Sequence, residues 1–243
     1  MYSRLLKDNG LVNFIGGSDY NFRAATNSAE QLVKDYKRLI KAASITQPVE
    51  LYTGSQTHST NVAYADGTSG ESFLIGRQYN DTDGLVTDKK NVALVIKFAD
   101  CTPIVLYDPV KKVQAIVHSG WRGTVGEISK VALLKMTNEY GVEIKNVIAY
   151  VGPSIGQENY EVGPEVYEAF LNNPDRDQFF KPQGEKYLLD MSLANVLLLH
   201  QAGISKANIE VEKATTYTDT RLHSARQEGK DYGLNAMITC FVQ

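Results

Sequence analysis

The sequence predicts a mixed α/β or α+β fold, organised as a single domain over residues 1–243. Segments typical of strands and helices interleave along the chain without a strict βαβ rhythm. Two strand-like runs, 102–107 and 112–118, are joined by a turn at Asp108-Pro109 and are typical of a hairpin. The chain contains no repeat, no low-complexity segment and no Gly-rich nucleotide loop. These observations argue against a Rossmann fold.

The expected strands are short runs rich in apolar and β-branched residues. In the last of these runs, every second residue is apolar. This alternation predicts a strand with one well-buried side. The Gly-, Asp-, Ser- and Thr-rich segment 65–91 is expected to be a surface excursion that contains one short strand. The predicted strands are residues 11–15, 49–53, 84–87, 92–98, 102–107, 112–118, 147–151, 209–211 and 234–242.

The expected helices have recognisable ends. Ser28 and Gln31 match a capping box, and an apolar face with helical spacing follows them. Glycines are expected to end two other helices. We interpret His200 and Cys240 as core residues, because both lie on apolar faces. The predicted helices begin near residue 28, run from Gly123 to about Tyr140, and span 164–172 and 190–201.

The composition is that of a globular protein, with 43% hydrophobic and 22% charged residues. A formal charge of -3 does not support a nucleic-acid partner. The chain has no apolar run that could span a bilayer and no signal-peptide core at its N-terminus. Two cysteines do not make a disulfide framework, so we expect a cytoplasmic protein with reduced thiols. A monomer is compatible with these features.

His58, Cys101 and His118 form the candidate metal site. Each lies at a junction between a strand and a loop, where a rigid scaffold can direct a side chain into a pocket. Catalytic zinc commonly has three protein ligands from His, Cys and carboxylates. Taken singly, Cys101 is typical of a small buried residue and each histidine of a structural one. Cys101 as a nucleophile with a histidine base is a further alternative.

Arg122 and Arg226 are the candidate anion-binding residues. A cation is unfavourable near a helix N-terminus, so an arginine at position 122 is better explained by a bound anion. Arg122 as a solvated helix-start residue is the alternative. Ser119 and Gly120, which connect His118 to Arg122, are further candidates for substrate binding. Asp100 is interpreted as a turn former or a hydrogen-bond acceptor behind the ligands.

Five motifs occur in the order seen in one protein family. The resemblance that they carry covers nearly the whole chain, and the pair of motifs that contain Cys101 and His118 is highly specific. The sequence therefore resembles the YfiH/YlmD family, also called laccase-domain or polyphenol oxidoreductase proteins. The motifs are Gln56-Thr-His58, Asp83-Gly-Leu-Val-Thr87, Ala99-Asp-Cys-Thr-Pro-Ile104, His118-Ser-Gly-Trp-Arg-Gly123 and Gly152-Pro-Ser-Ile-Gly-Gln-Glu-Asn-Tyr-Glu-Val-Gly163.

The resemblance implies a fold and an activity. The fold is a single α/β domain of layered mixed sheets with flanking helices, similar to bacterial cytotoxic-factor deamidase domains. The implied zinc ligands are His58, Cys101 and His118. The implied activity is phosphorolysis of adenosine, inosine, guanosine and methylthioadenosine, together with adenosine deamination. Copper-dependent polyphenol oxidation has also been ascribed to the family, and some members are linked to editing of peptidoglycan precursors.

The chain departs from the family pattern in three places. The N-terminal stretch Phe14-Ile-Gly-Gly17 lacks the usual arginine, Ser154 replaces a usual cysteine, and residues 222–227 differ from the usual C-terminal motif. The last change adds His223 as a candidate polar group for the pocket.

The leading hypothesis is a zinc-dependent purine nucleoside enzyme whose small-molecule partners are purine nucleosides and phosphate. Three alternatives remain: a copper-dependent polyphenol oxidase, a hydrolase acting on a peptidoglycan precursor, and a non-catalytic binding module. Four histidines in the whole chain are too few for a multicopper cluster.

Overall fold

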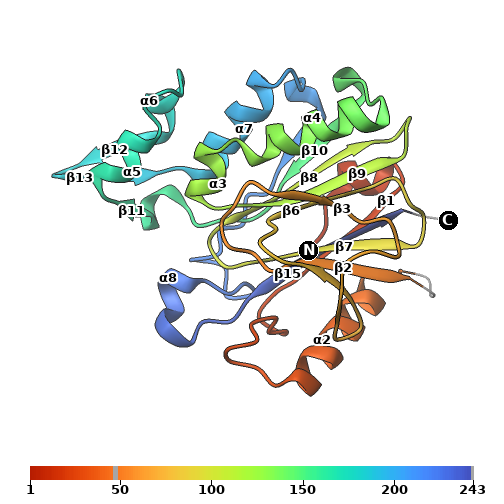
Figure 1. Cartoon of the computed structure of the whole chain (residues 1–243). Coiled ribbons are helices and arrows are strands. Elements are labelled where there is room, and N and C mark those ends of the chain that lie inside the picture. The colour runs from red at the N-terminus through yellow and green to blue at the C-terminus, as the bar shows by residue number, and fades with distance from the viewer. Residues whose placement is uncertain (46–48, 242–243) are drawn as a thin grey trace.

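The protein consists of two stacked β-sheets with helices on both outer faces (Figure 1). The computed structural model describes residues 1–45 and 49–241. One apolar cluster fills the space between the two sheets, and two others lie between each sheet and its helices. The layers therefore run helix, sheet, sheet, helix. The predicted mixed α/β architecture with layered sheets is confirmed.

The first sheet is mixed. Its strand β15 pairs antiparallel with both β1 and β7, whereas β2 pairs parallel with β7 and with β5. The first and last strands of the chain are thus neighbours. The strands, in spatial order, are β1 (Leu11–Gly16), β15 (Asn235–Phe241), β7 (Val92–Phe98), β2 (Glu50–Gly54), β5 (Gly76–Tyr79) and β4 (Glu71–Phe73).

The second sheet contains the predicted hairpin. Its register places Pro103 opposite His118 and Thr102 opposite Ser119. The start of one hairpin strand, just after Cys101, therefore lies beside the end of the other. The strands, in spatial order, are β14 (Ile209–Val211), β10 (Ile148–Val151), β8 (Thr102–Asp108), β9 (Val113–Ser119), β6 (Gly84–Thr87) and β3 (Val62–Tyr64).

Three longer helices cover the sheets. Helix α2 (Ala29–Ala42) begins where the capping box predicts, since the Ser28 hydroxyl accepts a hydrogen bond from the Gln31 amide, and its apolar face packs on the first sheet. Helices α4 (Ile128–Tyr140) and α7 (Met191–Gln201) cover the second sheet. No helix within 1–45 and 49–241 has the length and apolar character needed to cross a membrane.

A small third sheet lies at one end of the molecule, at the left of Figure 1. Its aromatic and aliphatic side chains form a separate apolar cluster. The sequence analysis did not predict this sheet. Its strands, in spatial order, are β11 (Glu161–Val162), β13 (Lys186–Leu189) and β12 (Phe180–Gln183). The short helices α5 (Pro164–Ala169) and α6 (Arg176–Phe179) share its apolar cluster.

The structure corrects two predicted segments. Residues 65–91 are not a surface excursion, because they contribute β4 and β5 to the first sheet and the fully buried β6 to the second. The helix expected from Gly123 to Tyr140 is two helices, α3 (Trp121–Val125) and α4. The break follows from packing: a Cβ atom on Gly126 would clash with Thr60 Cγ2, and Glu127 adopts a left-handed φ of 55°.

Other differences concern element ends and single residues. The helix predicted over 164–172 ends at Ala169. Two short N- and C-terminal helices, α1 (Arg4–Asp8) and α8 (Ala225–Glu228), were not predicted. His200 is exposed and not part of the core, whereas Cys240 is buried as predicted. Val242, the last residue of the predicted final strand, lies outside the described residues.

Candidate metal centre

His58, Cys101 and His118 meet at one point of the structure. One potential ligand atom from each residue lies within 4.8 Å of the others. Cys101 Sγ is 3.8 Å from His58 Nε2, and the two imidazole rings are arranged edge to face with centroids 5.0 Å apart. The predicted N,S,N cluster is therefore assembled from three separate chain segments.

Backbone geometry explains how these segments converge. His58 itself has a left-handed φ of 64°, in the loop that follows β2. Asp100, just before Cys101, has a φ of 81° in the tight connection between β7 and β8. Such values are uncommon for residues other than glycine and mark positions fixed by their surroundings. His118 lies in β9, and the hairpin register places it beside Cys101.

Asp83 organises the site from behind. Its Oδ1 atom is 2.8 Å from His118 Nδ1 and also accepts the His58 amide at 3.1 Å. Its Oδ2 atom accepts the amides of Thr57 and Ser59. Asp83 is 0% exposed and His118 5% exposed, so the pair is shielded from water. One carboxylate therefore holds two of the three candidate ligands.

The charges of the cluster stabilise one another. Burial alone would raise the pKa of Asp83, but the hydrogen bond and charge of His118 and the amides of the loop lower it to about 2. Burial opposes ionisation of Cys101, yet the charge and hydrogen bond of His118 lower the pKa of the thiol to about 6. These interactions favour the thiolate, which is the form that binds metals.

Gly120 leaves room for the cluster. A Cβ atom at this position would lie 2.8 Å from His58 Cδ2 and 2.9 Å from Cys101 Sγ. Any larger residue would push against two of the three candidate ligands. The predicted role of Gly120 in substrate binding stays a prediction, and the geometry gives it a steric role at the ligands.

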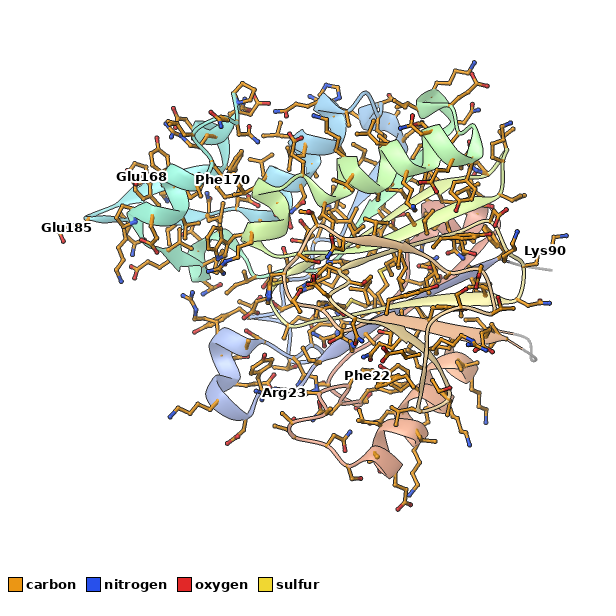
Figure 2. The ribbon with its side chains drawn as sticks, in the orientation of Figure 1. Phe22, Arg23, Lys90, Glu168, Phe170 and Glu185 are labelled. Carbon is orange, nitrogen blue, oxygen red and sulfur yellow. The ribbon has the colours of Figure 1, made fainter. Side chains whose placement is uncertain are left out.

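A cavity of about 430 Å³ adjoins the three residues. Aromatic side chains form much of its wall, and Phe22 lies between the first sheet and α2 (Figure 2). The ring of Tyr232 is fixed by Arg23, whose guanidinium carbon lies 3.9 Å from the ring centroid. Lys97 and Gln78 contribute polar groups to the same cavity. This volume is within the range of small-molecule sites.

The two predicted anion-binding arginines lie on another side of the cluster. Arg122 is exposed and stacks on Trp121, with its guanidinium carbon 4.2 Å from the ring centroid. Arg226 lies over the ring of Tyr160 at 5.4 Å. Burial first, and then the charge of Cys101, raises the pKa of Tyr160 to about 12, while Arg226 and Arg122 lower it. Tyr160 therefore lies within electrostatic reach of both arginines and of Cys101.

Asp100 connects this side to the metal ligands. Its two carboxylate oxygens accept the Thr216 hydroxyl at 2.6 Å and the Arg226 amide at 2.7 Å. It thus fixes the start of α8 directly beside the turn that precedes Cys101. Asp100 is thus a turn residue, as one of the two interpretations had it, and its carboxylate accepts from α8 and Thr216 rather than from a candidate ligand.

Three polar residues from the sequence analysis are engaged elsewhere. The Ser119 side chain is buried and hydrogen-bonded to Thr124 and Asn195, so a substrate contact through its hydroxyl would require that network to open. His223 does not line the cavity, contrary to our expectation, because its ring is hydrogen-bonded to Glu228 and to the Tyr20 carbonyl. The exposed His200 contacts the Ile204 carbonyl.

The sequence analysis missed three residues of the site. Asp83 was noted only as part of a motif, although a carboxylate directly before a buried strand is a candidate hydrogen-bond partner. Lys97 is the one charged residue in the apolar run Val92–Phe98, which was an unused signal. Tyr160 lies within the quoted motif Gly152–Gly163, but it precedes a strand of the unpredicted third sheet, and the motif alone did not indicate its position near Cys101.

The cluster fits a metal ion. Metal–sulfur and metal–nitrogen bonds of zinc, at tetrahedral angles, separate the two ligand atoms by about 3.5 Å. The distance of 3.8 Å between Cys101 Sγ and His58 Nε2 is close to that value. Two imidazoles and one thiolate leave a fourth position open, as in catalytic sites. The same donors also suit copper.

Comparison with known proteins agrees with this site. Residues 15–241 match the family described as multi-copper polyphenol oxidoreductase laccase. The chain belongs to this family. The match covers the loop of His58 and the hairpin that carries Cys101 and His118, so the whole cluster lies within the laccase-type domain.

Several relatives in this laccase-type family have names or structures. A purine nucleoside phosphorylase of Bacteroides thetaiotaomicron is 31% identical over 221 residues, which are 87% of this chain and 81% of the relative. Adenosine deaminase RL5, from an unknown prokaryotic organism, is 35% identical over 195 residues, covering 76% of this chain and 72% of the relative. The crystal structure of the hypothetical protein YfiH of Bacillus licheniformis superposes with a TM-score of 0.86 at 25% identity, covering 93% of this chain and 90% of that one. The resemblance to YfiH-like proteins is thus confirmed.

Proposed function

We propose that the protein is a zinc-dependent purine nucleoside enzyme that cleaves adenosine, inosine, guanosine and methylthioadenosine with phosphate and also deaminates adenosine. The carrying observation is the His58–Cys101–His118 cluster beside a cavity of about 430 Å³. The names of the relatives, a purine nucleoside phosphorylase and an adenosine deaminase, support this reaction class.

The residues of the cluster have distinct roles in this proposal. His58, Cys101 and His118 hold the zinc ion, which supplies Lewis acidity when bound. Asp83 holds the proton on His118 Nδ1, so Nε2 is the nitrogen that would give up its proton to bind a metal. Gly120 keeps the space beside His58 and Cys101 open.

The two reactions differ in what they require. Phosphorolysis breaks the bond between the anomeric carbon and the base and forms a bond from that carbon to a phosphate oxygen. Deamination adds water to C6 of adenine and releases ammonia. Only phosphorolysis needs an anion site, and Arg122 and Arg226 remain our proposed phosphate ligands because guanidinium–phosphate contacts are charge-assisted. Two observations support this proposal: the Arg226 amide donates to Asp100, which precedes Cys101, and Arg122 follows His118 by four residues.

Product analysis tests this function. Zinc-loaded protein is incubated with adenosine, with and without phosphate. Adenine plus ribose 1-phosphate demonstrates phosphorolysis, and inosine demonstrates deamination. Formation of neither product, with zinc bound at full occupancy, contradicts the proposal.

A copper-dependent polyphenol oxidase is the second candidate, favoured by the family description and by a donor set that copper also accepts. The remaining two histidines do not support a multicopper cluster, because His223 contacts Glu228 and His200 is exposed on α7. Oxygen consumption with a phenolic substrate and copper-loaded protein tests this alternative. We rank it below the nucleoside enzyme.

A further inference from the structure

Lys97 is a cation that lines the cavity. The charge of the nearby Asp83 carboxylate acts on it, but within residues 1–45 and 49–241 it has no salt-bridge partner. It lies near the end of β7 and lines the cavity together with His58, Cys101 and His118. Its Nζ atom donates to the Gly54 carbonyl at 2.9 Å. None of the ion pairs formed within 1–45 and 49–241 includes Lys97. An ammonium group offers three donors, so two remain available to a ligand.

The backbone of Lys97 is fixed to the loop that carries a metal ligand. The side-chain Nε2 of Gln56 donates to the backbone carbonyl of Lys97 at 2.6 Å. The side-chain Oε1 of Gln56 accepts from the backbone N–H of Lys97 at 2.9 Å. Gln56 lies two residues before His58. This clamp holds the lysine and the metal cluster at a constant separation, which a shared ligand would require.

The walls around Lys97 suit a flat aromatic ring. Phe22, Phe73 and Tyr232 line the cavity, and Lys97 Nζ lies 6.0 Å from the centroid of Phe73. Aromatic rings stack favourably on one another. Gln78 adds an amide that makes no side-chain hydrogen bond among the described residues. A free phosphate ion in this cavity would contact one cation, Lys97, and would make no favourable contact with the apolar walls.

We propose that this cavity binds the purine ring of the nucleoside, with Lys97 donating a hydrogen bond to an acceptor nitrogen on the edge of the ring. This inference rests on the proposed function and assigns the base subsite of the same site. Burial lowers the pKa of Lys97 to about 8, so the group remains mostly protonated at neutral pH. When the bond to the sugar breaks, its electron pair moves onto the base, and a nearby ammonium group stabilises that charge.

Deaza analogues of adenosine test the contact directly. Adenine has three ring acceptors outside the glycosidic nitrogen, and 1-deaza-, 3-deaza- and 7-deazaadenosine each lack one of them. Binding to zinc-loaded protein is measured by calorimetry for the parent chain, for Lys97→Met and for Lys206→Met, an exposed lysine on the surface.

For the parent chain, we expect one analogue to bind about 10- to 100-fold more weakly than adenosine, as for the loss of a hydrogen bond to a charged group. Lys97→Met should bind adenosine more weakly by a similar factor and should no longer distinguish that analogue. Lys206→Met should behave as the parent. A parent chain that binds all three analogues as well as adenosine overturns the inference, whether or not the variant folds.

The same measurements separate this inference from the proposed function. Binding of adenosine that depends on Lys97, without any turnover, supports the base subsite and contradicts the enzyme assignment. Turnover of adenosine with unchanged affinity and unchanged analogue discrimination in Lys97→Met overturns the base subsite and leaves the enzyme assignment intact.

Discussion

His118 Nδ1 lies 2.8 Å from Asp83 Oδ1, and both side chains are buried. This contact determines which ring nitrogen carries the proton, and it leaves Nε2 directed toward the cluster. Because the same carboxylate also accepts the amides around His58, the two histidines do not orient independently. A change at Asp83 therefore acts on two ligands at once.

Asp83→Asn should weaken zinc binding. The substituted side-chain amide has one acceptor oxygen instead of two, and it lacks the negative charge that holds the His118 ring in place. We therefore expect zinc affinity to fall about 10- to 100-fold. Competition with a chelator of known affinity measures the effect. Asp81→Asn is the control. Asp81 lies two residues before Asp83, and its exposed carboxylate accepts a hydrogen bond from the Asn61 side chain. Equal losses in both variants would contradict a specific role for Asp83.

Cys101→Ala should remove most bound zinc and most activity while the fold is retained, since the ligands are carried by preformed strand ends. Cys240→Ala is the matched control: it removes a buried sulfur from β15 and should cost about 1 kcal/mol of stability without changing turnover. Elemental analysis, circular dichroism and activity are compared. Full zinc occupancy and full activity in Cys101→Ala would show that the ligand set is wrong.

Gly120→Ala should displace His58 or Cys101, because the added Cβ approaches both below 3.0 Å. We expect lower metal affinity with modest loss of thermal stability. Gly123→Ala, in the short helix α3 that Gly120 precedes, would place its Cβ atom 3.4 Å from the nearest atom and should bind zinc normally. Zinc titration measures the affinity of both variants. Normal zinc affinity in Gly120→Ala would contradict a steric role of Gly120 beside His58 and Cys101.

Arg122→Ala should raise the phosphate concentration required for phosphorolysis and depress that reaction much more than deamination. None of the ion pairs within residues 1–45 and 49–241 includes Arg122, and the nearby Glu127 pairs with Lys130 at 2.9 Å. The stack on Trp121 is present, so a purely structural role would lower both activities together. The readout is the ratio of adenine to inosine across a phosphate titration.

Arg176→Ala is the control for this experiment, because Arg176 stacks in a similar way on Tyr167 of α5, beside the third sheet. Its product ratio should equal that of the parent chain. An unchanged ratio in Arg122→Ala, at equal thermal stability, would end the assignment of a phosphate ligand.

Lys97→Met should change how stability depends on pH. The pKa of Lys97 falls from 10.5 to about 8 on folding because of burial. Between these values the unfolded chain binds a proton that the folded chain has lost, so the stability of the parent rises with pH. The variant lacks this rise. Its free energy of unfolding, relative to that of the parent, should therefore decline between pH 8 and 10.5, by on the order of 1 kcal/mol for each unit by which folding lowers the pKa of Lys97. Urea unfolding at pH 7, 9 and 10.5 measures the trend, and a constant difference would contradict it.

Local signals identified much of this fold and site. The capping residue Ser28, the apolar strands and the hairpin turn at Asp108 each depend on neighbouring residues, and all were predictable. The break at Gly126 depends on Thr60, a residue far along the chain, and no local pattern encodes it. The motifs contained the three ligands. Their separation and the clamp between Gln56 and Lys97 arise from tertiary contacts, which the sequence does not display.

The position of β15 has a consequence for biosynthesis. This strand follows every other strand in the chain, yet it lies between β1 and β7 in the first sheet. A ribosome releases β1 and β7 long before their shared neighbour exists, so both strands wait with unpaired edges. Because β7 leads directly to the turn that carries Cys101, the strand behind this ligand gains its second neighbour only after residues 235–241 have emerged.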